Sequence, residues 1–246
     1  KSSFSSIGPD NSEARPTYNE ANLLERLEVR LRGAAQWTTF VENIDYNEKG
    51  QRTRIEYGYG VLTEYNYNPL TFRLSQMRTT RKSDNAHLQD LRYTYDPVGN
   101  ITEIRDEAQQ TIFFDNAVVS PNNLYEYDAL YRLIRAEGRE HIGQNTNNLP
   151  EHHSELKPHF DFNDITRRNL AHPHNGQAMR NYVEEYEYDA VGNIMAMQHQ
   201  ANGGNWTRSY DYATDSNRLR STSLPSDLEN AALPERYLYD AHGNKT

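Results

Sequence analysis

The stretch Tyr93-Thr94-Tyr95-Asp96-Pro97-Val98-Gly99-Asn100 decides the fold of this 246-residue chain, because it returns twice in nearly the same form. The second copy is Tyr186-Glu187-Tyr188-Asp189-Ala190-Val191-Gly192-Asn193, and the third is Tyr237-Leu238-Tyr239-Asp240-Ala241-His242-Gly243-Asn244. A recurring phrase marks one supersecondary unit that buries its face only against its neighbours. The repeat therefore predicts a repetitive β structure rather than a compact enzyme domain.

Each position of the phrase has a physical reason. Two tyrosines at i and i+2 point to the same side of a strand, and tyrosine packs well on a half-buried pleated surface. Asp opens a turn by bonding the backbone two residues on, and Gly supplies the positive φ that tightens it. An aliphatic residue such as Ile101 or Ile194 then restarts the chain as a strand. The phrase predicts a β-hairpin with a tyrosine face.

Looser copies fill the gaps between the three clear ones. Residues 45–51 keep the turn glycine Gly50, residues 65–74 keep the paired tyrosines, and residues 18–24 and 210–219 are weaker still. The copy at 125–133 has Tyr131 where glycine belongs. Because a positive φ is costly for a bulky residue, we expect this turn to have a different geometry.

We expect these residues to act by geometry, with the second tyrosine of each copy packed between hairpins and glycine holding each turn. The residues assigned to the repeat are Tyr93, Tyr95, Asp96, Gly99, Asn100, Tyr125, Tyr127, Asp128, Tyr186, Tyr188, Asp189, Gly192, Asn193, Tyr237, Tyr239, Asp240, Gly243 and Asn244.

Composition excludes several classes of protein. A net charge of −9 argues against a basic surface that binds nucleic acid. The mean hydropathy of −0.99 and the hydrophobic content of 35% are low for a globular domain, although 18 tyrosines supply amphipathic area. With no cysteine there is no disulfide, and no apolar run suits a membrane span or a signal peptide. The combination of low hydropathy with many tyrosines predicts a thin sheet with both faces exposed to solvent.

The pattern divides the chain into four segments. We expect a polar lead-in loop at 1–16, a β strip at 17–140, a His- and Asn-rich insertion at 141–182, and a second strip at 183–246. A shorter polar insertion covers 224–235. Alternating Leu27, Val29 and Leu31 favour a strand, although a helix over 20–32 also fits the leucine spacing.

Three groups of residues are candidates for chemistry. The insertion holds His141, His152, His153, His159, His172 and His174 near Glu155, Asp161 and Asp164. Imidazole and carboxylate suit zinc, but the spacing matches no ligand signature, which favours a solvated loop. Paired carboxylates can hydrolyse glycosides, yet the hairpin itself requires each turn aspartate. Trp37 and Trp206 can stack on sugar rings, although packing needs the same rings. We expect no catalytic, cofactor-binding or metal-binding residue.

The repeats resemble those of a known protein family. The stretches NIDYNEKGQRTRIEYGY (43–59), QDLRYTYDPVGNITEIR (89–105) and YEYDALYRLIRAEGR (125–139) are similar to the YD repeats of the Rhs family. They most resemble the Rhs-repeat region of the B component of bacterial insecticidal toxin complexes and related SpvB-containing proteins. The resemblance covers nearly all of residues 17–246.

The resemblance implies an all-β strip of antiparallel hairpins that forms part of a hollow shell around a toxic polypeptide. Implied partners are the remaining shell or other toxin-complex subunits and the enclosed toxin, with secretion as the implied location. The alternative is a cell-surface or carbohydrate-binding module like that of teneurins.

The chain also departs from the complete family pattern. It lacks the Rhs core signature with its aspartate-based self-cleavage site, the SpvB and propeller parts, and a toxin domain, so the family's self-proteolysis is assigned to no residue. Both ends resemble cuts in a longer polypeptide, and a strip of this length is expected to be too short to close a shell.

Overall fold

The computed structural model of the chain describes residues 6–8, 10–143, 174–223 and 235–245. Within these residues the regular structure consists of β-strands and one short 3-10 turn, η1 (Leu31–Gly33). The predicted all-β class is therefore confirmed. A search of the same residues finds no helix with the length and apolarity needed to cross a bilayer.

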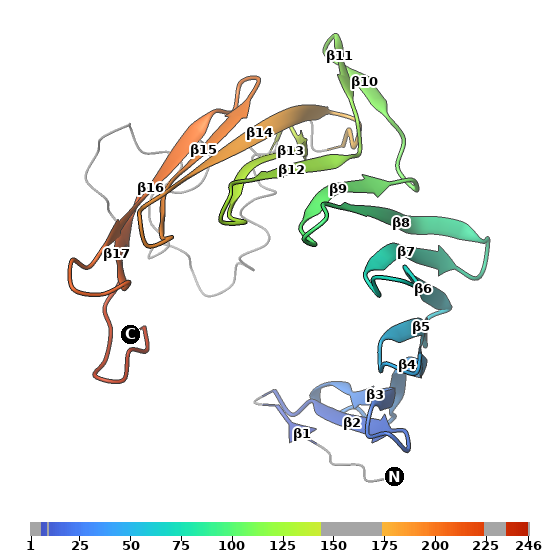
Figure 1. Cartoon of the computed structure of the whole chain (residues 1–246). Helices are drawn as coiled ribbons and strands as arrows, with labels where there is room; N and C mark the ends of the chain where they lie inside the picture. Colours follow the sequence, from blue (N-terminus) through green and yellow to red (C-terminus); the bar gives the residue numbers. More distant parts are fainter. Residues whose placement is uncertain (1–5, 9, 144–173, 224–234, 246) are drawn as a thin grey trace. The chain divides into compact units, whose positions relative to one another are not determined.

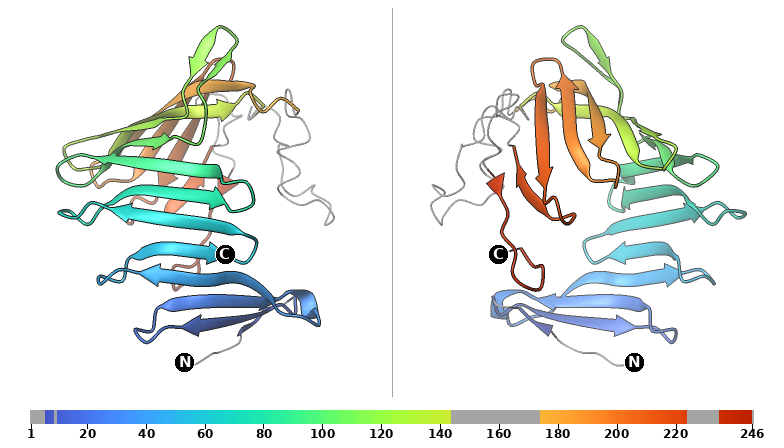
Figure 2. Two further views of the ribbon diagram at one scale, coloured as in Figure 1. Left: turned by 90° about the vertical axis from the view of Figure 1, so that its right-hand side faces the viewer. Right: turned by 60° about the vertical axis from the view of Figure 1, so that its left-hand side comes forward.

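The chain forms two units, one of residues 1–94 and 104–109 and the other of residues 95–103 and 110–246. The strands of the first unit are β1 (Ser6–Ile7), β2 (Glu13–Tyr18), β3 (Leu24–Arg30), β4 (Thr38–Tyr46), β5 (Arg52–Tyr57), β6 (Val61–Tyr67), β7 (Leu74–Arg81) and β8 (Ala86–Tyr95). Each pairs antiparallel with the next strand in sequence. Figure 2 shows these strands, in blue to cyan, side by side in a single layer.

The second unit repeats this arrangement. Its main strands are β12 (Asn123–Tyr127), β13 (Leu133–His141), β14 (Met179–Tyr188), β15 (Ile194–Ala201), β16 (Trp206–Tyr212), β17 (Leu219–Thr222) and β18 (Glu235–Arg236), again each antiparallel to the next. The strand β9 (Ile101–Asp106) has residues in both units. A separate hairpin, β10 (Ile112–Phe114) with β11 (Ala117–Val119), stands apart from the main strands (Figure 1).

The strands begin earlier than the sequence patterns suggested. The strand β2 begins at Glu13, inside the expected lead-in loop 1–16, because Arg15 and Thr17 pair with Glu28 and Arg26 of β3. The strand β14 begins at Met179, inside the expected insertion 141–182. The strand interpretation of 24–30 is confirmed, and the helical alternative is wrong. Residues 144–173 and 224–234 of the two insertions lie outside the described residues.

The hydrophobic core is thin, as the low hydropathy predicted. The buried apolar side chains among the described residues are Ile44, Ile55, Val119, Ala136, Ala178 and Ala201. In the first unit Ile44 lies opposite Ile55, which lies opposite Thr63 on the same face. Such cross-strand neighbours are the unit of stabilisation in a sheet. Stability therefore comes from many small cross-strand contacts rather than from a thick core.

Candidate functional site: the turn edge and the two faces of the sheet

The repeat turn is held by its opening aspartate. At Asp189, Oδ1 accepts the backbone N–H groups of Val191 at 3.0 Å and Asn193 at 2.8 Å, while Oδ2 accepts the Asn193 side-chain amide at 2.8 Å. Gly192 donates its N–H to the Asp189 carbonyl at 3.2 Å and has a φ of 98°. Aspartate, glycine and asparagine therefore each supply a separate part of one closed turn.

The other copies use the same bonds. Asp96 and Asp240 each accept the backbone N–H and the side-chain amide of the asparagine four residues later. The Asn244 amide is the main cause that lowers the pKa of Asp240. For Asp189, desolvation acts to raise the pKa, but the hydrogen bonds from Asn193, Val191 and Gly192 together outweigh it and the pKa is lowered. Ionised aspartate is thus the form that the turn stabilises.

The turn at Tyr131 corrects a prediction. We expected a different geometry there, but Tyr131 has a φ of 64° and donates its N–H to the Asp128 carbonyl at 3.0 Å, as Gly192 does to Asp189. Arg132 replaces the usual asparagine, and its Nε donates to Asp128 Oδ2 at 2.7 Å. The bonds of Asp128 thus keep the turn shape despite the cost of a left-handed conformation for a bulky residue.

In five copies of the repeat, the second tyrosine joins one hairpin to the one before it. Its hydroxyl donates to the carbonyl of the first residue in the return strand of the preceding hairpin. The donor and acceptor residues are Tyr46 and Leu24 (2.6 Å), Tyr67 and Arg52 (2.9 Å), Tyr127 and Ile101 (2.8 Å), Tyr188 and Leu133 (2.6 Å), and Tyr239 and Leu219 (2.8 Å). We call these tyrosines the clamp tyrosines.

A β-bulge accompanies this position. The pairing register shifts immediately before Tyr18, Tyr46, Tyr67, Tyr127, Tyr188 and Tyr212. A bulge bends a strand and redirects the side chain next to it. The bulge therefore accounts for a tyrosine that leaves its own hairpin and reaches the neighbouring backbone.

One face of each unit carries rows of alternating charge. In the first unit the row runs Asp45, Arg54, Glu64, Arg78 and Asp90, each directly opposite the next. Arg78 Nε lies 3.0 Å from Asp90 Oδ2, and Asp90 is only 3% exposed. Opposite charges across a strand pair stabilise it, although exposed pairs contribute little each. We call this side of the sheet the charged face.

The second unit has a shorter row of the same kind. Glu126 lies opposite Arg135, which lies opposite Glu185. Arg135 is within 3.7 Å of Glu126 and 3.4 Å of Glu185. Each of the two units therefore has a face on which opposite charges alternate and nearly cancel along the row.

The opposite face, which we call the tyrosine face, holds a buried ionic cluster in the second unit. The row here runs Tyr125, Ala136, Glu184, His199 and Trp206 across five strands. His199 is 4% exposed, and its Nδ1 lies 3.2 Å from Glu184 Oε1.

A second row of the cluster lies four residues along the strands, beyond the pair formed by Gly138 and Tyr182. Glu140 is opposite Arg180 on β14, whose Nε donates to Glu140 Oε1 at 2.6 Å. His199 Nε2 lies 3.3 Å from the same oxygen, at ion-pair distance but without hydrogen-bond geometry. Burial favours a neutral imidazole, but the carboxylates of Glu140 and Glu184 outweigh it and raise the pKa of His199 to about 9.

Aromatic rings enclose this histidine. Its ring stacks on Trp206 with centroids 4.8 Å apart and on Tyr182 at 5.1 Å. A Cβ built on Gly138 would meet the Tyr182 hydroxyl at 2.7 Å, so only glycine leaves room for that ring. In the first unit the guanidinium of Arg15 lies 4.4 Å from the Trp37 ring centre. Both tryptophans named as candidate sugar-stacking residues therefore already have partners.

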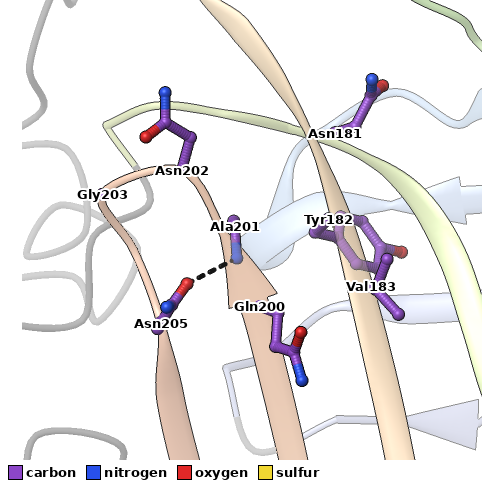
Figure 3. Close-up of a pocket in the computed structure, with 8 residues that line it drawn as sticks. All are labelled: Asn181, Tyr182, Val183, Gln200, Ala201, Asn202, Gly203 and Asn205. Carbon is purple, nitrogen blue, oxygen red and sulfur yellow. Dashed lines mark hydrogen bonds between the residues drawn. The ribbon is translucent and has the colours of Figure 1, made fainter.

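A shallow pocket of about 440 Å³ lies at the β14 and β15 strand ends (Figure 3). Its lining residues are Asn181, Tyr182, Val183, Gln200, Ala201, Asn202, Gly203 and Asn205. Two of its amides are used structurally: Asn205 Oδ1 accepts the Ala201 N–H at 2.8 Å, and Asn181 Nδ2 donates to the Val118 carbonyl at 3.0 Å. These two side-chain amides of the pocket thus serve the fold.

The histidine-rich insertion is largely untested. His152, His153, His159 and His172 lie outside the described residues, as do Glu155, Asp161 and Asp164. His141 is described, and its Nε2 lies 3.0 Å from the Asn175 carbonyl oxygen. In the part of the chain that the structure describes, no group of three or more ligating side chains is placed to hold a metal.

Sequence reasoning missed the buried ionic cluster. Glu140, Arg180, Glu184 and His199 are scattered over 60 residues, and nothing in their spacing marks them. Counting back from the Asp189 turn places Glu184 and His199 opposite each other only when the bulge before Tyr188 is included, and the sequence does not mark that bulge.

Comparisons with known proteins give a consistent result. No protein-family model matches the chain. It is 35% identical over 239 residues to toxin subunit YenC1 of Yersinia entomophaga, covering 94% of the chain and 22% of that protein. Toxin subunit YenC2 of the same organism is 34% identical over 237 residues, covering 92% of the chain and 23% of that protein. The chain therefore spans about a fifth of the length of these relatives.

Solved structures agree. The crystal structure of TcdB2–TccC3 matches with a TM-score of 0.68 and 31% identity, over 98% of this chain and 12% of the other. The complex of TcdB2–TccC3 with Cdc42 also matches with a TM-score of 0.68 and 31% identity, over 98% and 11%. A Tc holotoxin pore from Photorhabdus luminescens matches with a TM-score of 0.63 and 28% identity, over 98% and 12%.

Proposed function

Because this chain belongs to the Rhs family of YD-repeat toxin-complex proteins, we propose that it is a wall segment of a container that encloses a toxic polypeptide. The main support is that each unit is a single layer of strands paired in the order of the sequence, with the hairpin β10–β11 set aside as a separate two-stranded sheet between β9 and β12. Such a sheet extends by adding hairpins and gains area instead of a core. Area is what a wall requires.

The way the distinctive residues are used supports a non-enzymatic role. The turn aspartates bond their own turns, and the clamp tyrosines bond the preceding hairpin. The buried carboxylates Glu140 and Glu184 contact cationic partners within the sheet. We therefore assign these groups to the construction of the wall and give none of them a chemical step.

The partners that we propose follow from the relatives. YenC1 and YenC2 are toxin subunits, and TcdB2–TccC3 is itself a complex of two named components. We propose that this chain joins the remaining Rhs shell or other toxin-complex subunits, and that the enclosed toxin is its cargo. Secretion as part of a toxin complex belongs to the same proposal.

The two faces suit a wall that separates cargo from solvent. The rows of alternating charge nearly cancel, and the tyrosine face presents rings whose hydroxyls are bonded within the sheet. Along the described rows of the charged face, an unfolded chain would meet charged side chains rather than the apolar surface that binds such a chain. A polypeptide held inside would therefore be confined without being bound tightly.

Electron cryo-microscopy of the natural polypeptide that carries this segment tests the proposal. We expect residues 13–143 and 174–223 to form part of a closed wall, with one face toward a cavity that contains density for a second polypeptide segment. A map with bulk solvent on both faces of the sheet would overturn the container function, even if the hairpins were as described.

A further inference from the structure

The ionic cluster of the tyrosine face joins two successive repeat hairpins. Glu140 belongs to the hairpin β12–β13, whereas Arg180, Glu184 and His199 belong to the hairpin β14–β15. Arg180 Nε donates to Glu140 Oε1 at 2.6 Å, and His199 Nε2 lies 3.3 Å from the same oxygen. His199 Nδ1 faces Glu184 Oε1 at 3.2 Å. One imidazole therefore stands between carboxylates from both hairpins.

Aromatic and charged groups from the neighbouring strands also face His199. From β14 come Tyr182, stacked on the imidazole, and Tyr186, whose hydroxyl donates to Glu184 Oε2 at 2.7 Å. From β16 comes Trp206, also stacked on the imidazole, and beyond it Arg208, whose Nη2 lies 3.3 Å from Thr222 Oγ1. From β12, Tyr125 stands in the same cross-strand row. Burial raises the pKa of Tyr125, Tyr182 and Tyr186 above the usual 10, so His199 is the first of these groups to change charge as pH rises.

Charge balance depends on that imidazole. With His199 protonated, two carboxylates face two cations and the buried cluster is neutral. A neutral imidazole has one N–H, so it can donate to Glu140 or to Glu184 but not to both. Loss of the proton to solvent would leave one uncompensated negative charge where His199 is 4% and Glu140 9% exposed. An unpaired buried charge is strongly unfavourable.

We propose that Glu140, Arg180, Glu184 and His199 form an ionic latch that reinforces the backbone pairing of these two hairpins at neutral pH and is lost in alkaline solution, so that the joint between them loosens. The latch works because His199 is the only bridge between the two carboxylates in this described cluster, and its aromatic neighbours keep water from replacing it. The latch itself does not depend on the proposed function. The interpretation that its opening loosens a container wall does rest on that function.

The sign of the pH effect follows from the direction of the shift. The carboxylates raise the pKa of His199 from 6.5 to about 9 in the folded chain. A group whose pKa is raised by folding contributes stability that is complete below its unfolded pKa and is lost as pH rises through its folded pKa. The latch is therefore fully closed below about pH 6.5 and opens through about pH 9.

Tryptophan fluorescence reports the latch directly, because a protonated imidazole stacked on an indole quenches its emission. In a Trp37→Phe background, Trp206 is the only emitting tryptophan in the chain. We expect its emission to rise between pH 7 and 10.5 with a midpoint near 9. We also expect amide exchange in β13 to β15, corrected for its intrinsic pH dependence, to accelerate at least tenfold over the same range.

Three comparisons decide the outcome. His199→Gln should abolish the fluorescence step, Glu140→Gln should move its midpoint toward 6.5, and the control His87→Gln on β8 should leave it unchanged. NMR titration of His199 in the unsubstituted chain gives a readout that needs no variant to fold. A midpoint near 6.5 there, or an equal alkaline response in His199→Gln, would overturn the latch. Neither result would bear on the container, which the cryo-microscopy map tests separately.

Discussion

The connections at the two ends of the strands differ in how much their length varies. We call these two sides, where turns join the strand ends, the two edges of the sheet. At the edge with the repeat turns, the connections 19–23, 47–51, 128–132 and 189–193 are all five residues long, and 68–73 and 213–218 are six. At the other edge, the connections range from 58–60 to 142–178. Turns alternate between edges in an antiparallel meander. The repeat therefore specifies one edge closely and leaves the other free to carry insertions, including the hairpin β10–β11.

The largest expected difference between the edges comes from insertion. Two glycines added between Ala190 and Val191 would break the bonds of Asp189 and displace the clamp Tyr188. At about 1 kcal/mol for each lost hydrogen bond, we expect a destabilisation of about 3 kcal/mol. The same insertion between Lys82 and Ser83, at the other edge, should cost about 0.5 kcal/mol through loop closure.

Urea unfolding of the two insertion variants checks this contrast. Equal losses at both edges would show that the repeat turn is no more constrained than an ordinary loop.

Substitutions at two equivalent turn positions should change stability less than the insertions do, and in opposite directions, because of their backbone conformation. Gly192 has a φ of 98° and Tyr131 a φ of 64°. Gly192→Ala should destabilise the second unit by about 1 kcal/mol, because alanine is strained at positive φ. Tyr131→Gly should stabilise it by a few tenths of a kcal/mol, since relief of strain exceeds the added entropy of the unfolded chain. A loss of stability in Tyr131→Gly would mean that the tyrosine ring itself stabilises the turn.

The clamp tyrosines should each contribute about one hydrogen bond. Tyr188→Phe removes the donor to the Leu133 carbonyl and is expected to cost about 1 kcal/mol in urea unfolding. Tyr131→Phe is the matched control, because the side chain of Tyr131 is exposed at the turn tip. If the two substitutions had the same effect, the joint between hairpins would not depend on the hydroxyl.

The smallest expected effect is at acid pH. The pKa of Asp189 is lowered below 3.8 in the folded chain, because the hydrogen bonds from Asn193, Val191 and Gly192 together outweigh desolvation. Its contribution is thus present above about pH 4 and lost as pH falls through the folded pKa. Asp189→Asn should fold, since Asn47 makes the same turn. Its melting temperature should fall less between pH 5 and 3 than that of the parent chain.

Local features of the fold were predictable from the sequence, and non-local ones were not. The hairpins and the turn roles of Asp189 and Gly192 depend on residues within one phrase, so composition and spacing were enough. The clamp acceptors depend on a bulge and on which strand lies alongside, neither of which the phrase encodes. The prediction of a different turn geometry at Tyr131 was wrong. The steric preference against a positive φ is at most a few kcal/mol, and the bonds of Asp128 outweigh it.

The buried cluster was beyond reach for the same reason. Glu140 and His199 meet only because β13, β14 and β15 pair in one register. Without knowledge of that register, the sequence suggests only that these two residues are ordinary polar residues on solvent-exposed strands. The proposed function lies at the same non-local level, since a wall would be a property of many paired hairpins.

The central claim is that one face of this sheet looks onto an enclosed polypeptide. Photo-crosslinking in the natural polypeptide tests it, with p-benzoylphenylalanine placed in turn at Tyr125 on the tyrosine face and at its neighbour Glu126 on the charged face. Successive residues of a strand point to opposite faces, so the two probes differ only in side. We predict adducts with the enclosed segment from one position and none from the other. Adducts from neither position, or equally from both, would contradict the account.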